Sequence, residues 1–329
     1  MQWNKSISFV LSIVLIFSLS VMPGFRALSV GTDTLNYQSL LNLDFDIFQY
    51  IAIGQEPAFS LILTLVKILG VEDYYFLVVA VITNTFVVLA INRMKGYRFL
   101  VLFSYLTFST IYFASFNIVR QCVAVAIFLL AFTYLIEGNK LRYILLILLA
   151  TCFHYTSFFL FIFIFVDYLS RFKFLGYFFS FIIPFIINIF SIFFIYFASG
   201  LLGVDKLTYS ARISEVGGRF YFIMNLFCIG LYFLLLGFSR KNYLYISLLL
   251  LNLSFLINIS FLGMSYEGVG RLVFYTNIIW ILAVPAIMSR IKRDERLLFV
   301  LLFVLLGSLH FLINVVLRNM HEVLPYYFV

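Results

Sequence analysis

The feature that most constrains this chain is a series of apolar runs of about 17 or more residues along the whole sequence. A helix needs about 20 apolar residues to cross the hydrocarbon core of a bilayer. Hydrophobic residues make up 64% of the chain and charged residues 11%, whereas a soluble domain carries about 25% charged residues. The runs are too long for the alternating strands of an outer-membrane barrel. We therefore expect an all-α polytopic membrane protein, with residues 1–329 as a single integral membrane domain.

The apolar runs predict 11 transmembrane helices, with 12 as the alternative. The block from Leu141 to Val166 is interrupted by the sequence Phe-His-Tyr-Thr-Ser at 153–157, and it is interpreted as two short crossings that meet at a polar elbow. The other nine crossings are expected at 6–22, 74–91, 99–115, 119–136, 174–198, 220–238, 243–261, 272–289 and 297–317.

Clusters of Lys and Arg predict the orientation, because such residues concentrate in cytoplasmic loops. If the clusters at 93–98, 140–142, 171–173, 240–241 and 290–296 are all cytoplasmic, the helices between them alternate without contradiction. The cytoplasmic face then carries a charge of about +10 and the remainder about −2, within a formal net charge of +8. The basic balance is therefore explained by topology and gives no support to nucleic-acid binding. The N-terminus is expected inside and the C-terminus outside.

Residues 23–73 do not fit this alternation as a crossing. The apolar part, from Pro57 to Leu69, has only 13 residues, contains Lys67 and is followed by an acidic turn. If it crossed fully, the 93–98 cluster would lie outside. We therefore expect one long external segment whose second half is a short re-entrant or interfacial helix.

The external segment carries the first candidate catalytic residues, the carboxylates Asp33 and Glu56. A carboxylate beside the membrane surface can deprotonate a sugar hydroxyl, and Glu56 is the first choice, ahead of Asp33. Tyr37 follows Asp33 by four residues, so a helix would place both on one face. The structural alternative is that Asp33 caps a short helix, and that Glu56 lies in the first turn of the next helix with Pro57 at its first position.

Arg120 and its neighbour Gln121 are expected at the outer mouth of a helix. An arginine there can bind a pyrophosphate through two parallel hydrogen bonds. The alternative is that Arg120 heads a stripe of small residues, formed by Ala124 and Ala131, which lets another helix pack closely. His154, in the polar elbow on the same side, is the third candidate for proton transfer, and a structural hydrogen-bonded histidine is its alternative.

Two further external regions contain candidate substrate-binding residues. The loop at 199–219 is rich in glycine and carries Arg212, so it is expected to be either a lid over a polar substrate or a long linker. Arg271 follows a glycine-containing turn, and Tyr275 lies one helical turn beyond it. Arg271 could bind the same anion while Tyr275 contacts a sugar ring or lipid, whereas interface anchoring is the alternative.

Taken in order, these patterns resemble the EpsG type of Wzy-like bacterial polysaccharide polymerases. The resemblance covers about 31–165 and the region around Arg271, and it rests on order and membrane position. The matching patterns are Asp33-x-x-x-Tyr37, Glu56-Pro57-x-Phe59, Val119-Arg120-Gln121, Phe153-His154-Tyr155-Thr156-Ser157 and Arg271-x-x-x-Tyr275.

The resemblance implies a GT-C-like helical architecture and a glycosyltransferase that joins undecaprenyl-pyrophosphate-linked oligosaccharide repeat units. The expected location is the bacterial inner membrane, with the active site facing the periplasm or exterior. Expected partners are lipid-linked oligosaccharides, the bilayer, and chain-length regulator and flippase proteins. No Asp-x-Asp pair or His/Cys cluster requires a metal, so no cofactor is expected, although a divalent ion on the pyrophosphate stays an open alternative.

Three other functions compete with polymerisation. A flippase or transporter of lipid-linked oligosaccharides predicts charged residues near helix midplanes and pseudo-symmetric halves, and the sequence has neither pattern. An O-antigen ligase or a membrane O-acyltransferase would share the external site or a catalytic histidine. The related ligases usually have a much larger external loop than the loop at 199–219, which favours the polymerase.

Overall fold

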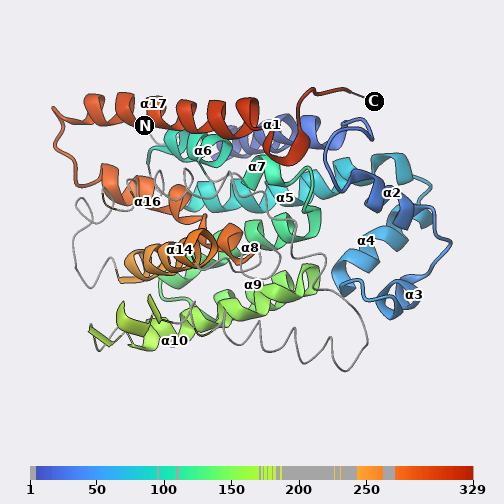
Figure 1. Cartoon of the computed structure of the whole chain (residues 1–329), viewed down its shortest axis with the longest axis horizontal. Helices are drawn as coiled ribbons and strands as arrows, with labels where there is room; N and C mark the ends of the chain where they lie inside the picture. Colours follow the sequence, from blue (N-terminus) through green and yellow to red (C-terminus); the bar gives the residue numbers. More distant parts are fainter. Residues whose placement is uncertain are drawn as a thin grey trace. The chain divides into compact units, whose positions relative to one another are not determined.

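The computed structural model describes residues 5–94, 96–108, 111–169, 243–261 and 271–328, together with isolated positions between 172 and 230 (Figure 1). These residues are helical apart from turns and one isolated bridge between Arg26 and Phe328. The chain divides into two compact units. Unit 1 comprises Met1–Leu160 and Leu297–Val329, and unit 2 comprises Phe161–Arg296. The expected all-helical fold is confirmed for the described part of the chain.

Four helical stretches of unit 1 are long and apolar enough to cross a membrane by length and composition. They contain α1 (Lys5–Gly24), α5 (Tyr75–Arg93), α8 (Val119–Ile136) and α17 (Arg296–Phe311) with the π-helical turn Leu312–Leu317 that follows it. In α8, 83% of the spanning window is buried, whereas only 22% is buried in the windows of α1 and α17. Thus α8 forms the centre of unit 1, between α5 and α9 (Lys140–Phe153).

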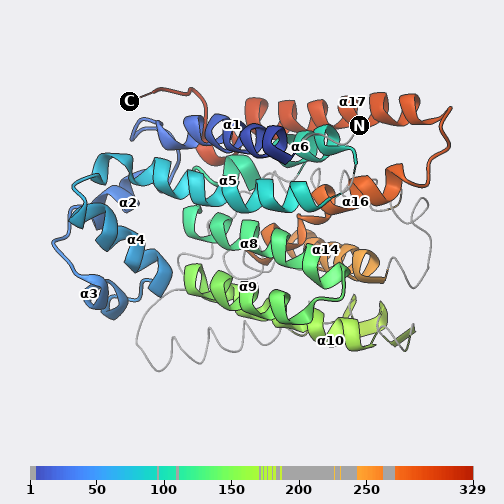
Figure 2. The same cartoon turned by 180° about the vertical axis from the view of Figure 1, so that it is seen from behind.

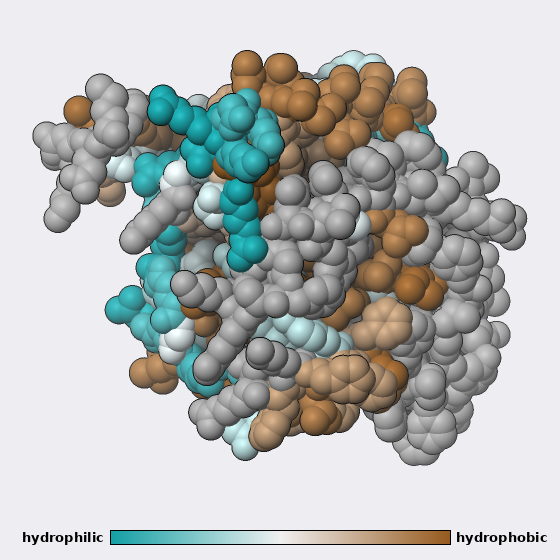
Figure 3. All heavy atoms as spheres, turned by 90° about the vertical axis from the view of Figure 1, so that its left-hand side faces the viewer, coloured by the Kyte–Doolittle hydropathy of each residue, from teal (hydrophilic) through white to brown (hydrophobic). Residues whose placement is uncertain are grey.

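The exposed surface of α1 and α17 is hydrophobic. Phe9, Phe17, Leu297 and Leu301 are all more than half exposed. Figure 3 shows hydrophobic side chains along its upper edge, where α1 and α17 lie in Figure 1, and hydrophilic side chains mainly toward the left of the view. Apolar surface of this extent suits contact with lipid rather than water.

One of the predicted helices of unit 1 is interrupted. The run at 99–115 was expected as one span, but α6 (Arg98–Thr107) ends early and the short α7 (Ile111–Ala114) follows. Gly307 of α17 packs here so closely that a Cβ atom would lie 2.5 Å from the Phe103 ring. The elbow predicted at 153–157 is confirmed. Helix α9 ends at Phe153, and a 3-10 helix at Tyr155–Phe161 and α10 (Ile162–Leu169) follow.

Three short helices follow α1 and lie at one end of unit 1, on the right of Figure 1 and on the left of Figure 2. They are α2 (Thr34–Leu41), α3 (Ile47–Ala52) and α4 (Pro57–Ile68). Asp46 starts α3 through a reciprocal capping box with Gln49. Pro57 is the first residue of α4, as expected. With 12 residues, α4 is about 18 Å long, and it is too short to cross a bilayer core of about 30 Å.

Residues after α17 return to this same end of unit 1. The backbone N–H of Ala27 donates to the carbonyl of Tyr327 at 2.9 Å, and that of Gly31 donates to the carbonyl of Glu322 at 3.0 Å. Gly31 has a positive φ of 90°, and a Cβ atom there would lie 2.5 Å from Asn117 Oδ1. Only glycine suits this position, both for its backbone conformation and for the space available.

Unit 2 contains α14 (Tyr243–Phe261), whose limits match the prediction, and α15 (Arg271–Thr276) followed by α16 (Ile279–Met288). The run at 272–289 was expected as one helix, but it turns at Asn277. Asn252 Nδ2 donates to Thr276 Oγ1 at 2.8 Å and to Asn277 Oδ1 at 2.9 Å. These buried bonds provide partners for polar groups at the break, where an unpaired group would be costly. The runs expected at 174–198 and 220–238, and the loop at 199–219, lie largely or wholly outside the described residues.

Candidate active site

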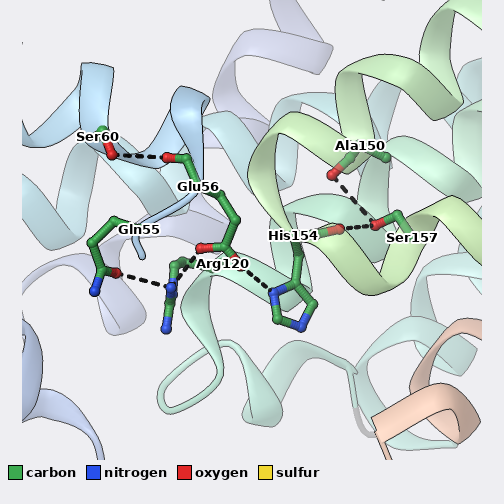
Figure 4. Close-up of polar contacts among 7 residues, drawn as sticks. All are labelled: Gln55, Glu56, Ser60, Arg120, Ala150, His154 and Ser157. Carbon is green, nitrogen blue, oxygen red and sulfur yellow. Dashed lines mark hydrogen bonds and ion pairs between the residues drawn. The ribbon is translucent and has the colours of Figure 1, made fainter. Parts of the chain in front are cut away.

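The candidate site lies where the start of α4, the start of α8 and the end of α9 meet in unit 1. Helix α8 packs along α9, and α4 contacts α9. Glu56, Arg120 and His154 come from these three elements and form a continuous polar chain (Figure 4). Arg120 and His154 are 64 and 98 positions from Glu56 in sequence, so only the tertiary fold brings the three residues together.

Glu56 is the central member of this chain. It occupies the N-cap position of α4 with an extended backbone, yet its carboxylate makes no capping bond to that helix. One oxygen, Oε2, accepts a bond from Arg120 Nη1 at 2.5 Å, and Oε1 lies 2.7 Å from His154 Nδ1. The residue is 4% exposed. The expected alternative that Glu56 merely starts a helix is therefore insufficient, because its side chain makes its contacts with other elements.

Arg120 is the second residue of α8 and the most accessible of the three, with 27% of its side chain exposed. Its Nη1 also donates to Gln55 Oε1 at 2.9 Å, and Tyr37 shares a side-chain hydrogen bond with it. Its Cζ atom lies 5.0 Å from the centre of the Phe59 ring. A cation at a helix N-terminus is opposed by the helix dipole. The carboxylate of Glu56 compensates for this unfavourable position.

His154 is held by the backbone of the elbow. It has an extended conformation directly after α9, and its carbonyl accepts bonds from the N–H of Ser157 at 2.9 Å and the hydroxyl of Ser157 at 2.8 Å. The hydroxyl of Ser157 also lies 3.3 Å from the carbonyl of Ala150 (Figure 4). His154 is 9% exposed, and its buried Nε2 has no hydrogen-bond partner among the described residues.

The electrostatics of the site determine the tautomer of His154. Burial raises the pKa of Glu56, but the hydrogen bond with His154 and the charge of Arg120 outweigh burial, so that the pKa is lower than the ordinary 4.5. The carboxylate is therefore ionised at neutral pH and accepts both bonds. We accordingly assign a proton to Nδ1 of His154, so that in the neutral tautomer of the imidazole the lone pair is on Nε2.

Tyr37 and Asp33 flank this chain through α2. Tyr37 is 5% exposed and packs against Phe59 and Tyr75, with ring centres 5.9 and 6.3 Å away. Burial raises the pKa of Tyr37, and the charge of Asp33 adds to this effect against Arg120, so the hydroxyl stays protonated. Asp33 occupies the N-cap position of α2, but its side chain makes no capping bond. Asp33 thus stands at the start of α2, as the structural alternative held, but its side chain does not cap the helix, and its described link to the site is electrostatic.

The other predicted substrate-binding residues are Gln121, Arg271, Tyr275 and Arg212. Gln121 follows Arg120 and is 2% exposed within unit 1. Arg271 begins α15 of unit 2, and Tyr275 in the same helix is fully buried. Arg212 lies outside the described residues. Ala124 and Ala131 of α8 are also fully buried. The stripe of small residues below Arg120 is therefore packed, and Arg120 makes its polar contacts in addition.

Three residues near the site were not predicted from the sequence. Gln55 adjoins Glu56, but its bond to Arg120 had no sequence signal. Arg26 follows the end of α1, and Tyr75 is the first residue of α5. The one sequence feature that could have indicated Arg26 is its charge just beyond the first span. Among the described residues, no group of three or more His, Cys, Asp or Glu side chains could hold a metal ion.

Comparison with known proteins gives one result. The model of the EpsG family matches residues 9–328. No curated protein matches the chain, and no solved structure matches it. Because the family match extends over nearly the whole sequence, including all three helices that form the site, the chain belongs to the EpsG family.

Proposed function

We propose that this polysaccharide-polymerase-like membrane protein is a glycosyltransferase that joins lipid-linked oligosaccharide repeat units, with a polyprenyl diphosphate as the leaving group. Family membership supports the polymerase assignment. The observation that carries the chemical proposal is the buried chain Arg120–Glu56–His154, in which one histidine nitrogen is fixed by a carboxylate and the other has no partner.

The reaction requires three events. An acceptor sugar hydroxyl forms a bond to the anomeric carbon of the donor, the bond between that carbon and the diphosphate oxygen breaks, and the hydroxyl proton passes to a base. The electron pair leaves with the diphosphate, on which negative charge develops. A site for this chemistry needs a proton acceptor and a cation, held apart and in fixed positions.

In this proposal His154 accepts the proton at Nε2, and Glu56 is a positioning residue. Glu56 holds the Nδ1–H tautomer and stabilises the imidazolium that forms, as the carboxylate does in Ser-His-Asp triads. The lowered pKa of Glu56 and the occupation of both its oxygens make it a poor base itself. The preference for Glu56 over His154 that followed from the sequence is therefore reversed here.

Arg120 is proposed to bind the diphosphate. Its side chain is the most accessible of the three, and a guanidinium has five donors in a planar fork, more than its bonds to Gln55 and Glu56 use. Tyr37 and Gln121 would position Arg120 or contact substrate. Arg271, Arg212 and Tyr275 are retained as proposed substrate contacts from the sequence. The basic clusters support an orientation in which this end of unit 1 faces the periplasm or exterior.

The decisive test is reconstitution of the purified protein with a defined lipid-linked repeat unit. A ladder of products that differ by one repeat unit, with release of polyprenyl diphosphate, is expected. Transfer of a single oligosaccharide to a lipid A acceptor without a ladder would indicate a ligase. Movement of the intact lipid-linked unit across the vesicle membrane without new glycosidic bonds would indicate a flippase.

A further inference from the structure

Arg26 is a buried cation with no buried anion beside it. It is 2% exposed, and no carboxylate of the described residues lies within ion-pair distance. Its Nε donates to Thr34 Oγ1 at 3.2 Å and its Nη1 donates to the carbonyl of Pro23. Its Nη2 is buried and has no partner among the residues that the structure describes. Burial lowers the pKa of Arg26 to about 10, so the charge persists at neutral pH. An uncompensated buried charge is costly, and an anion would relieve that cost.

The hydroxyl of Tyr75 is a second unsatisfied group in the same region. Tyr75 is fully buried at the start of α5, and its hydroxyl has no hydrogen-bond partner in the described part of the chain. Buried tyrosine hydroxyls usually have one. The group interacts electrostatically with both Arg26 and Arg120. It therefore lies in a region of positive potential where a hydroxyl could donate a hydrogen bond to an anion.

Aromatic rings connect this region to the active site. The guanidinium of Arg26 lies 3.9 Å from the centre of the Phe76 ring, and Phe76 packs against Tyr75 at 5.1 Å. Tyr37, which bonds to Arg120, is 6.3 Å from Tyr75. These contacts lead to two carboxylates: Glu56, both of whose oxygens already have partners, and Asp33, whose charge acts on Tyr37. Among the described residues, neither carboxylate forms an ion pair with Arg26. Arg26 Nη2 and the Tyr75 hydroxyl are therefore available to bind an anion from outside the chain.

We infer that Arg26 and Tyr75 form a phosphate-binding subsite beside Arg120. This inference rests on the proposed function: Arg120 binds the phosphate next to the sugar or lipid, and the new subsite binds the other phosphate of the diphosphate. Because Tyr75 is fully buried, the phosphate enters past the partly exposed Arg120. The subsite therefore distinguishes a diphosphate from a monophosphate.

The test compares farnesyl diphosphate with farnesyl monophosphate, using the purified full chain in detergent and a direct binding measurement. The wild type is expected to bind the diphosphate at least tenfold more tightly. Tyr75→Phe should weaken diphosphate binding by about tenfold and change monophosphate binding by less than about twofold. Its melting temperature should be unchanged or higher, since the removed hydroxyl has no partner in the unliganded protein.

Tyr143→Phe is the matched control. The hydroxyl of Tyr143 is also buried, but it donates to the carbonyl of Leu160 at 2.6 Å. Its removal should lower the melting temperature and leave both affinities unchanged. Arg26→Lys, which keeps the charge and loses the fork, should reduce the preference for the diphosphate as Tyr75→Phe does.

The outcomes separate this inference from the proposed function. If the wild type prefers the diphosphate and both Tyr75→Phe and Arg26→Lys retain that preference, the subsite is overturned while the proposed donor stands. If the wild type binds neither farnesyl compound, the proposed donor and the subsite both fail. Inorganic pyrophosphate should compete for the wild type and compete about tenfold less well for Tyr75→Phe; equal competition would also overturn the subsite.

Discussion

The two ends of α8 carry the same kind of ion pair in two different settings. At its start, Arg120 pairs with Glu56, whose side chain is 5% exposed; near its end, Glu137 pairs with Arg93 of α5, and the Glu137 side chain is 53% exposed. Arg93 also bonds to Thr133 and stacks over Tyr134 at 3.6 Å. These contacts make Arg93 an anchor between α5 and α8. Only the buried pair continues to a third group with an unused proton acceptor.

The contrast shows which feature indicates chemistry. An exposed Arg–Glu pair contributes about 0 to 1 kcal/mol and has no need of a further partner. A buried pair pays a desolvation cost that geometry must offset. Here the carboxylate is shared with a histidine, so its burial also fixes a tautomer. A pair of residues alone therefore does not define the site; the third residue does.

The largest expected effect on activity comes from replacing His154, because the ion pair of Arg93 has no comparable third residue. His154→Gln removes the proposed proton acceptor, and the rate of polymer formation from a defined lipid-linked unit should fall by about 10² to 10⁴. His310→Gln is the control, because His310 is also buried but bonds to the carbonyl of Thr107. If His154→Gln polymerises at a near-normal rate in a preparation that is correctly folded, the base lies elsewhere and Asp33 becomes the next candidate.

A smaller effect on activity is expected when Arg120 or Arg93 is replaced by lysine. Arg120→Lys keeps the charge but loses the planar fork, and activity should fall by roughly ten- to a hundredfold. Arg93→Lys should change activity by less than about twofold. Both variants should be measured in the same assay at equal membrane levels of protein. Equal activities would mean that Arg120 is an anchor like Arg93 and that the diphosphate is bound by other residues.

The smallest expected effect concerns stability and pH. The pKa of Glu56 lies below 4.5 in the folded protein, so its ionised form stabilises the fold above that value. This stabilisation is lost as the pH falls through the lowered pKa. Glu56→Gln should therefore lower stability at pH 7 by about 1 to 3 kcal/mol, and the difference from wild type should shrink in acid.

Glu137→Gln provides the comparison for this measurement, with an expected cost of about 0 to 1 kcal/mol because its side chain is exposed. Thermal unfolding in detergent across a pH series would measure both variants. A loss in Glu56→Gln that is the same at every pH would show that hydrogen bonding, rather than charge, accounts for the effect.

Hydropathy predicted the limits of two long helices well, because the length of an apolar run corresponds directly to the length of a spanning helix. The limits of α8 and α14 match the expected 119–136 and 243–261. The elbow at His154 was also expected, because five polar or aromatic residues interrupt an apolar block. The break at Asn277 was missed, since its partner Asn252 lies 25 positions away on another helix. Hydropathy carries no information about such a contact.

The structure brings together three of the residues that the sequence singled out, and their contacts could not be predicted from the sequence. Glu56, Arg120 and His154 were all expected on one side of the membrane. Their mutual bonds depend on the packing of α4, α8 and α9, which no local pattern specifies, and so does the lowered pKa of Glu56. Arg26 and Tyr75 were missed for the same reason, because an unsatisfied group can be recognised only when its surroundings are known.

The division of unit 1 into 1–160 and 297–329 affects the order in which the protein is completed during synthesis. The ribosome makes α1 to α9 and then the whole of unit 2 before α17 and the residues that follow it emerge. Until then, the N–H groups of Ala27 and Gly31 lack their carbonyl partners at Tyr327 and Glu322. The segment after α1, which leads to Arg26 and α2, therefore gains these two backbone bonds only after all of unit 2 has been made.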